Sequence, residues 1–443
     1  MNIQLSDHFT YKKLFRFTLP SIVMMVFTSV YGVVDGYFVS NCVGKTPFAA
    51  LNLIYPFIMI LSGIGFMFGT GGSALIAKSL GQQQKEKANM QFSLIVYTSI
   101  VTGVILGIVG VVTVRPVAIL LGAKGEMIDL CVLYGAIILL AMPFFMLQFE
   151  FQSLFITAER PKLGLWSTVA SGGTNMILDW LFIAVFDWGL GGAAAATALA
   201  QVVGGVIPLV YFFSKNTSPL RLSAAVFDGR TLIKTVINGS SELMSNISMS
   251  VVSMLYNLQL MKYAGEDGIA AYGVLMYVSM IFIAIFIGYS VGTAPIISYH
   301  FGAKNHKELK SLFKKSSIII VVCSIAMLLA GELLAKPLSL LFVSYDQGLL
   351  DITLRGFIIF SFSFLFSGFA IYGSSFFTAL NDGVTSAIIS FLRTLVFQVA
   401  AILILPVFLK LDGIWLSLVV AELLAVAVNL LFLIIKRKKY NYW

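Results

Sequence analysis

The sequence is poor in charged residues and in the side chains that build metal sites and disulfide frameworks. Only 11% of its 443 residues are charged, and it contains three cysteines and three histidines. The cysteines show no paired spacing and the histidines have no companion ligands, so neither a disulfide framework nor a zinc site is expected. No nucleotide-binding motif occurs either, because the glycine-rich run at 63–72 lacks the lysine and serine that end a phosphate loop. We therefore expect no cofactor and no enzymatic activity.

Apolar residues, in contrast, make up 59% of the chain, and the mean hydropathy is +0.95. A soluble protein of this size cannot bury so much apolar surface, so the composition predicts an all-α protein that crosses a membrane many times. The first apolar run is too long for a cleavable signal peptide and lacks a small-x-small cleavage pattern. The net charge of +9 is then a matter of loop topology, and we expect contact with lipid and none with nucleic acid.

Twelve apolar runs lie between charged or turn-rich breaks, and each is long enough to cross a bilayer, which takes about 20 residues. When the loops are numbered alternately, 22 of the 29 Lys and Arg residues fall on one side. The positive-inside rule then places both termini in the cytoplasm, as expected for a multi-pass protein of the bacterial plasma (inner) membrane. The spans are predicted at 14–40, 50–77, 91–113, 130–151, 163–186, 192–213, 235–260, 270–298, 316–335, 352–378, 384–408 and 413–435.

The two halves of the chain resemble one another and are separated by the longest polar connection, 214–230. We predict a six-helix N-terminal lobe over 1–213, a cytoplasmic linker over 214–232 and a six-helix C-terminal lobe over 233–443. An even number of spans in each half makes the two repeats parallel, which is the arrangement of alternating-access transporters with a site between the halves. The halves align at one constant offset in numbering, which we call the repeat offset. It pairs Gly71 with Gly292, Gly81 with Gly302, and Gln201 with Glu422.

Two acids in the first half are the strongest candidates for a binding site. An ionised Asp near the middle of a spanning helix costs about 2.5–3.5 kcal/mol on insertion scales, so Asp35 and Asp179 each need a partner or a wet cavity. At 1.5 Å per residue both lie about 12–14 Å inside the outer ends of their spans. Ser171, Asn175 and Asp179 also share one helix face. The two acids can share a proton or a small cation. The alternative is that each pairs with a polar neighbour for structure alone.

The second half lacks this pair, because Asp35 corresponds to Tyr256 and Asp179 to Ala400. The seventh span carries instead a polar stripe at steps of about four residues, which suits a wall that faces water. Glu242 in this stripe either serves the cavity or pairs with a lysine such as Lys234. The stripe consists of Asn238, Glu242, Asn246, Ser250 or Ser253, and Asn257.

Two further acids lie in predicted spans. Glu422 corresponds to Gln201, which suggests a polar packing contact as readily as a binding role. Glu150 is expected at a cytoplasmic helix end, with a structural role. Most of the abundant Phe, Tyr and Met residues face lipid or the core, and some can line an adaptable cavity.

Taken together, the motifs resemble the multidrug and toxic compound extrusion (MATE) family over nearly the whole chain. The pattern is most similar to the bacterial branch that includes MepA-type pumps. The residues that carry the resemblance are LP at 19–20, VDGYFVSNCVG at 34–44, GTGGSALIAKSLG at 69–81 with its second-half echo, NMILD at 175–179 and GLGGAAAATALAQ at 189–201.

The resemblance implies a V-shaped pair of six-helix bundles that exports cationic or amphipathic drugs in exchange for H⁺ or Na⁺. It assigns Asp35, Asn175, Asp179 and Thr197 to a cation site in the N-terminal half, with a Na⁺ site at Asp35 and Asp179 if sodium is the coupling ion. It assigns Pro20 to the bend of the first helix.

The resemblance also matches Glu242 to an acid of the seventh helix in sodium-coupled members. Those members pair this acid with an Asp in the tenth helix, and the span at 352–378 has no interior acid. We therefore prefer the site in the first half.

We interpret the chain as a monomeric secondary active multidrug antiporter that works by alternating access. A flippase or exporter of a lipid-linked precursor is the main alternative, and it requires a cavity ringed with basic residues. A membrane-embedded transferase would need clustered polar residues in its loops, and the short loops have none. Beyond the cation site, the cavity is expected to draw on Tyr31, Gln201, Glu242, Asn246, Tyr256 and Asn257.

Overall fold

A computed structural model describes residues 3–343 and 346–443, and all the regular secondary structure in these ranges is helical. Three short π-helical segments, η1 to η3, interrupt or end α-helices. The first half contains α1 (Tyr11–Phe38), η1 (Val39–Val43), α2 (Lys45–Gly81), α3 (Lys85–Leu120), α4 (Glu126–Leu140), α5 (Met142–Thr157), α6 (Pro161–Asp179), η2 (Trp180–Val185) and α7 (Gly189–Phe213).

The second half follows a non-helical connection over 214–228. Its first helix therefore begins at Gly229, within the range predicted for the linker. The elements are α8 (Gly229–Gly302), α9 (His306–Val343), α10 (Gln347–Ser361), α11 (Ser363–Ala379), α12 (Gly383–Phe391), η3 (Leu392–Phe397) and α13 (Gln398–Tyr440).

The described helices account for twelve membrane crossings. Eight segments are long and apolar enough to span a membrane, and the bent pairs α4–α5 (59°) and α10–α11 (45°) can each form one more span. Two of the eight are double, because Gly265 interrupts α8 and Lys410 interrupts α13 with non-helical backbone. A straight helix of the length of α8 would measure about 110 Å, against a hydrocarbon core of about 30 Å. The twelve predicted spans are thus confirmed.

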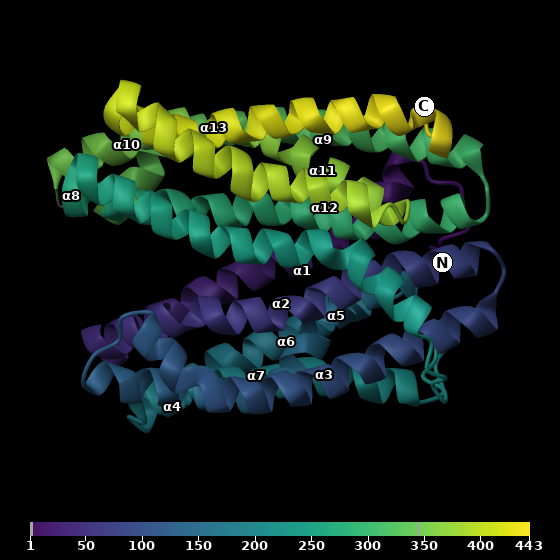
Figure 1. Ribbon diagram of the computed structural model, residues 1–443, viewed down its shortest axis with the longest axis horizontal. Helices are drawn as coiled ribbons and strands as arrows, with labels where there is room; N and C mark the ends of the chain where they lie inside the picture. Colours follow the sequence, from purple (N-terminus) through teal and green to yellow (C-terminus); the bar gives the residue numbers. More distant parts are fainter. Residues whose placement is uncertain (1–2, 344–345) are drawn as a thin grey trace.

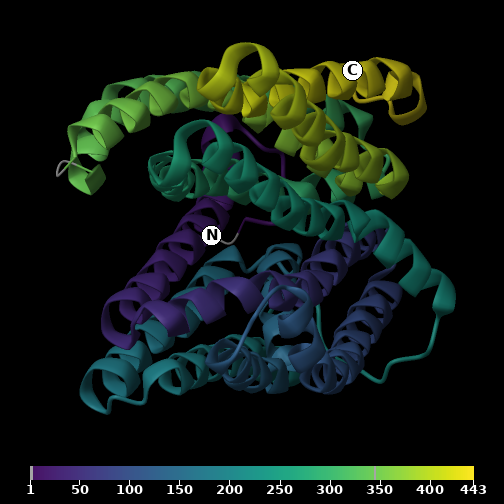
Figure 2. The ribbon, with the colours of Figure 1, turned by 60° about the vertical axis from the view of Figure 1, so that its left-hand side comes forward.

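The helices form two lobes that run side by side along the long axis of the molecule (Figure 1). α1 to α7 make the N-terminal lobe, and α8 to α13 make the C-terminal lobe. Both chain termini lie at the same end, which we call the terminal end, and the other end is the far end. Viewed with the left side turned forward, the lobes form two layers that meet where α1 and α2 of the N-terminal lobe pack against α8 of the C-terminal lobe (Figure 2).

The backbone confirms the repeat predicted from the sequence. Left-handed or otherwise positive φ values recur at the repeat offset, and each marks a turn between two spans. Glycine adopts such angles without strain, whereas other residues rarely do. The corresponding positions are Gly44 (110°) and Gly265 (63°), Gln83 (61°) and Lys304 (55°), and Gly189 (56°) and Lys410 (51°).

The lobes touch closely at the terminal end through glycines on α2 and α8. A Cβ atom added to Gly71 would meet the Thr235 carbonyl oxygen, and one added to Gly239 would meet that of Met67. Closer to the termini, Gly302 packs in the same way on the Lys78 carbonyl. Small residues at such crossings let two backbones approach directly.

No comparable contact closes the far end in the ranges that the structure describes. Cβ atoms added to Gly32 and Gly36 on α1, or to Gly273 on α8, would meet nothing within 4 Å. The lobes therefore diverge toward the far end, as Figure 1 shows on its left side. The result is the V shape that the family resemblance implies.

The first residues of the chain bridge the two lobes at the terminal end. The backbone N–H of Leu5 donates to Glu159 of the N-terminal lobe at 2.8 Å, and the N–H of Phe9 donates to Glu308 of the C-terminal lobe at 2.9 Å. His8 Nδ1 lies 2.6 Å from the same Glu308 carboxylate. The start of the chain thus adds a second set of contacts to the closed end.

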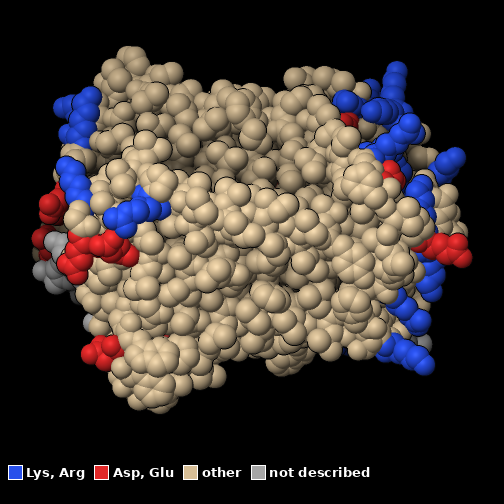
Figure 3. Space-filling view, turned by 60° about the horizontal axis from the view of Figure 1, so that its bottom comes forward, with Lys and Arg blue, Asp and Glu red and all other residues tan. Residues whose placement is uncertain are grey.

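Charged residues gather at the two ends of the molecule and leave a broad apolar belt between them. In the space-filling view, Lys and Arg crowd the terminal end, on the right, with some acids among them, and both signs of charge also occur at the far end (Figure 3). The belt is what a membrane-spanning protein presents to hydrocarbon chains.

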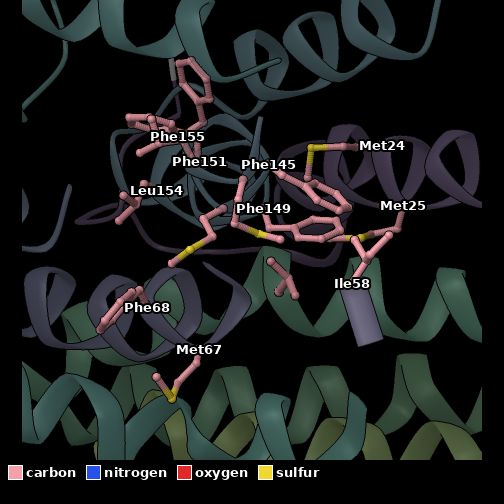
Figure 4. Close-up of a cluster of buried hydrophobic side chains, with 14 of the residues drawn as sticks. Met24, Met25, Ile58, Met67, Phe68, Phe145, Phe149, Phe151, Leu154 and Phe155 are labelled. Carbon is pink, nitrogen blue, oxygen red and sulfur yellow. The ribbon is translucent and has the colours of Figure 1, made fainter. Parts of the chain in front are cut away.

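The interior of the N-terminal lobe is packed with aromatic and sulfur-containing side chains (Figure 4). The ring centroids of Phe145 and Phe149 of α5 lie 4.9 Å apart, with the two rings tilted by 35°. They lie beside Met24 and Met25 of α1 and Ile58 of α2. This packing fixes α5 against α1 and α2, and so positions the wall of the cavity described next.

Candidate functional site

The acids predicted from the sequence meet inside the N-terminal lobe. Asp35 comes from α1, Asp179 and Asn175 from the end of α6, and Thr197 from α7. Asp179, Asn175 and Thr197 are the side chains that act on the Asp35 carboxyl group, and Asn175 Nδ2 donates to Thr197 Oγ1 at 3.3 Å. The structure therefore brings all four predicted cation-site residues together.

This cluster is short of hydrogen-bond donors. Asp179 is fully buried, and neither of its oxygens has a hydrogen-bond partner within the described ranges. A carboxylate can only accept, whereas a protonated acid can donate one hydrogen bond. One proton held between Asp35 and Asp179 would supply the missing donor. A small hard cation would be an equally suitable partner, because carboxylate, amide and hydroxyl oxygens are the ligands it prefers.

Segments of π-helix lie next to the charged interior residues. η1 begins four residues after Asp35, η2 begins directly after Asp179, and η3 contains Arg393. A π-helical turn adds a residue to the helix and rotates the following side chains, and such turns are frequent at functional sites. Helix periodicity alone does not predict these segments.

The cluster opens on a cavity of about 420 Å³ in the half of the lobe toward the far end. Asp35, Asn175 and Thr197 line it, and Asp179 lies behind them. The rest of the wall is mainly aromatic, and the described side chains that line it include no Lys or Arg. Its aromatic residues are Tyr31, Phe48, Tyr55, Phe66, Tyr134, Phe145, Phe149 and, from α8, Tyr277.

Of the six further cavity residues predicted from the sequence, Tyr31 and Gln201 line this cavity. The other four lie on α8 outside it. Tyr256 is buried in the C-terminal lobe and stacks on Tyr272 at 5.1 Å. Asn257 is exposed. Asn246 donates to the backbone carbonyl of Glu242 at 2.9 Å and faces Gly63 of α2.

The charged residues of the C-terminal lobe form an ion pair that sequence reasoning did not predict. Arg393 donates to the Glu422 carboxylate from Nε and Nη2 at 2.9–3.1 Å. Their side chains are only 14% and 2% exposed. Arg393 is also the positive charge that influences Glu242. Glu242 forms no ion pair with Lys234 within the part of the chain that the structure describes.

The structure corrects the placement of Glu150. The sequence suggested a helix end near this residue, but α5 continues to Thr157, and Glu150 is fully buried within it. The polar residues Gln152, Ser153 and Thr157 also lie buried within α5. Thr157 Oγ1 lies 2.6 Å from Ser73 Oγ on α2.

Sequence reasoning also missed part of the cavity wall. Gln148 of α5 and Tyr134 of α4 line it, and neither was predicted as a cavity residue. Pro20 lies inside α1, which continues through it as one helix. The sequence did indicate one part of the wall: the four-residue spacing of Ser171 and Asn175 predicted a shared helix face, and both residues line the cavity.

Comparison with known proteins agrees with this architecture. A family model described as MatE matches residues 20–181 and 243–404, one segment in each lobe. The multidrug export protein MepA of Staphylococcus aureus (strain MRSA252) is 26% identical over 435 residues, which cover 97% of this chain and 94% of the relative. MepA of Staphylococcus saprophyticus is likewise 26% identical over 435 residues, with the same shares of both chains.

Solved structures share the fold despite low sequence identity. One is described as the outward-facing conformation of a multidrug resistance MATE family transporter of the MOP superfamily. It is 23% identical, has a TM-score of 0.93 and covers 100% of this chain and 99% of its own. MATE in the straight conformation is 22% identical and has a TM-score of 0.92, with 98% of each chain covered. MATE in the bent conformation is 23% identical and has a TM-score of 0.89, with 98% and 97% covered.

Proposed function

Because this chain belongs to the MatE family of transporters, we propose that it is a secondary active antiporter that exports cationic, amphipathic compounds in exchange for H⁺ or Na⁺. The family resemblance inferred from the sequence motifs is confirmed by matches in both lobes. The proposal rests mainly on the acid pair of Asp35, which lines an aromatic cavity, and Asp179, which is fully buried behind it.

The chemistry of the cavity suits a flat or bulky organic cation. Aromatic faces attract cations through their quadrupole, and the attraction increases when water is excluded. The Asp35 carboxylate adds a full negative charge, and Met59 and Met280 add side chains that adapt to different shapes. A site of this kind selects ligands by their charge and apolar character rather than by one molecular shape, and multidrug export requires such selection.

Drug export is coupled to ion movement if the ion and the drug compete for the same carboxylate. A proton or Na⁺ at Asp35 and Asp179 neutralises the charge that attracts the drug. Each ligand drives the transport cycle only if it binds the two lobe arrangements with different affinity. The position of Asp35 on α1, one of the helices at which the lobes meet, supports such a difference.

The proposed orientation places the terminal end in the cytoplasm. The excess of Lys and Arg at this end (Figure 3) supports it through the positive-inside rule. The glycine contacts between α2 and α8 close the terminal end, and the lobes diverge at the far end. In this orientation the structure represents the arrangement open to the outside.

The flippase alternative is not favoured. A phosphate group of a lipid-linked precursor calls for Lys or Arg in the cavity, and none lines it among the described residues. Arg393, the basic residue deepest in the C-terminal lobe, is paired with Glu422.

The test uses the purified protein in liposomes, with ethidium efflux followed under an imposed pH gradient or an imposed Na⁺ gradient. We expect one of the gradients to drive efflux in the wild type, and Asp35→Asn to abolish it. Asp129→Asn is the matched control, since Asp129 is an exposed acid paired with Arg115. Normal coupling in Asp35→Asn would remove the proposed site. Failure of both gradients to drive any cationic dye would restore the flippase alternative.

A further inference from the structure

A second hollow, of about 260 Å³, lies at the terminal end, outside the drug cavity. α2 and α3 of the N-terminal lobe form one wall, and the start of α8 in the C-terminal lobe forms the other. Each lobe contributes two cations: Lys78 and Lys87 come from the N-terminal lobe, and Arg230 and Lys234 come from the C-terminal lobe. The hollow therefore exists only where the two lobes meet.

Among the described residues that line the hollow, these four cations face a single carboxylate, Asp228, and Arg230 is the cation that acts on it. None of them takes part in an ion pair within the described ranges. Lys78 is half-buried, and the like charges of Lys87 and Lys234 act on it. Its Nζ lies 5.1 Å from the centre of the Phe301 ring, a contact that favours the charged form. Holding like charges together in this way is unfavourable unless an anion joins them.

The one carboxylate that lines the hollow is engaged elsewhere. Asp228 caps α8: it accepts from the backbone N–H of Arg230 at 3.0 Å and from the Thr231 hydroxyl at 2.7 Å. One carboxylate against four cations leaves an excess of positive charge. The hollow therefore has the excess positive charge expected of a binding site for an external anion.

We propose that this hollow binds the phosphate headgroup of an anionic membrane lipid. Lysine ammonium groups bind phosphate as point charges, and arginine adds directed hydrogen bonds. Basic pockets between spanning helices at the cytoplasmic surface suit anionic headgroups. The turn of α8 that carries Lys234 also exposes Ile233 (62%) and Ile237 (43%). A lipid can lay its acyl chains on these residues, whereas a soluble phosphate gains nothing from them.

A bound headgroup would join the lobes. Its phosphate would screen Lys78 and Lys87 from Arg230 and Lys234, and without it their repulsion favours separation of the lobes. An anionic lipid therefore stabilises the arrangement that is closed at the terminal end. The assignment to the cytoplasmic leaflet depends on the orientation proposed above, but binding to the hollow does not.

The experiment measures phosphatidylglycerol retained by the full chain in native mass spectrometry, after purification in micelles that also contain phosphatidylcholine. Lys87→Gln with Lys234→Gln tests the hollow, and both residues are exposed, so the variant should fold. Lys310→Gln with Lys438→Gln is the control, because these exposed lysines lie outside the hollow. We expect the affinity to fall about fivefold for each cation removed from the hollow, and to be unchanged in the control.

Equal retention by the wild type and by the Lys87 and Lys234 variant would overturn the proposal. A second arm adds inorganic phosphate to the protein in phosphatidylcholine alone. Thermal stabilisation equal to that by phosphatidylglycerol would show that a soluble phosphate suffices, which overturns the lipid assignment. The readout does not involve transport, so it stands whether or not the chain is an antiporter.

Discussion

Arg393 and Glu422 form a buried ion pair at the place in the C-terminal lobe that corresponds to the cavity wall of the N-terminal lobe. At the repeat offset, Arg393 corresponds to Gly172, which packs against Tyr31 of the cavity wall. Glu422 corresponds to Gln201, which lines the cavity. The two lobes share a backbone but differ in charge: one holds unpaired acids beside a cavity, and the other holds a neutralised pair. This difference supports the proposal that the ion and the drug bind in the N-terminal lobe.

Breaking the ion pair should be costly. Arg393→Ala leaves Glu422 buried without its partner, and the loss of one member of a buried pair costs about 3–5 kcal/mol. Replacing both residues, as in Arg393→Met with Glu422→Leu, should restore most of the stability. Thermal unfolding in detergent measures both. Arg115→Ala is the control, because its exposed pair with Asp129 is worth about 0–1 kcal/mol. Equal losses in the single and double variants would contradict a specific pair.

The two acids of the N-terminal lobe should act as one unit. Asp35→Asn and Asp179→Asn are each expected to abolish ion-coupled efflux, and the double variant should lose no more than either single variant. Effects of residues that bind one ligand together are strongly non-additive. Initial efflux rates in liposomes test this expectation. Partial losses that multiply in the double variant would mean that the two acids work independently.

The glycine contacts between the lobes predict a conformational shift. In Gly239→Ala, the added Cβ would collide with the Met67 carbonyl oxygen, so the terminal end should open. Spin labels at the exposed positions 85 and 307, one on each lobe, should report a longer distance than in the wild type. Gly173→Ala is the control, because a Cβ there meets nothing within 4 Å. An unchanged distance distribution in Gly239→Ala would show that this contact does not hold the lobes together.

Asp382, in the turn before α12, should make stability depend on pH in the acid range. Burial alone would raise the pKa of this carboxyl group. The hydrogen bond from Tyr440 (2.7 Å), a weaker one from the Thr385 N–H, and Lys436 at 3.3 Å outweigh burial and hold its pKa below the ordinary value of 3.8. Its contribution is therefore fully present above about pH 4 and is lost as the pH falls through the lowered pKa.

The variant Asp382→Asn tests this contribution. It exchanges charged for neutral hydrogen bonds, so unfolding at pH 7 should become easier by about 1 kcal/mol. The difference from the wild type should shrink as the pH falls through the lowered pKa of Asp382 and disappear once this carboxyl group is protonated. Tyr440→Phe, which removes one donor and keeps the carboxylate, should show part of the loss with the same pH dependence. A loss of equal size at pH 7 and once this carboxyl group is protonated would point to packing rather than charge.

The pattern of residues along the sequence determined the secondary structure and the internal repeat of this protein. Apolar runs of spanning length predicted twelve crossings, because hydrocarbon allows almost no other backbone arrangement than a helix. The repeat was recognisable in the sequence because glycines recur at corresponding positions, as at Gly71 and Gly292 and at Gly81 and Gly302, where helices pack closely. Asp35 and Asp179 stood out because an acid inside a span is too costly to keep without a partner.

Only the tertiary structure decided which helix faces meet. Gln148 and Tyr134 line the cavity, and Arg393 reaches Glu422 across 29 residues of chain, yet no periodicity links these positions. The π-helical segments beside Asp179 and around Arg393 change the direction of the side chains that follow. Helix periodicity is a property of neighbours along one chain, whereas a cavity, an ion pair or a basic hollow depends on contacts between helices distant in sequence.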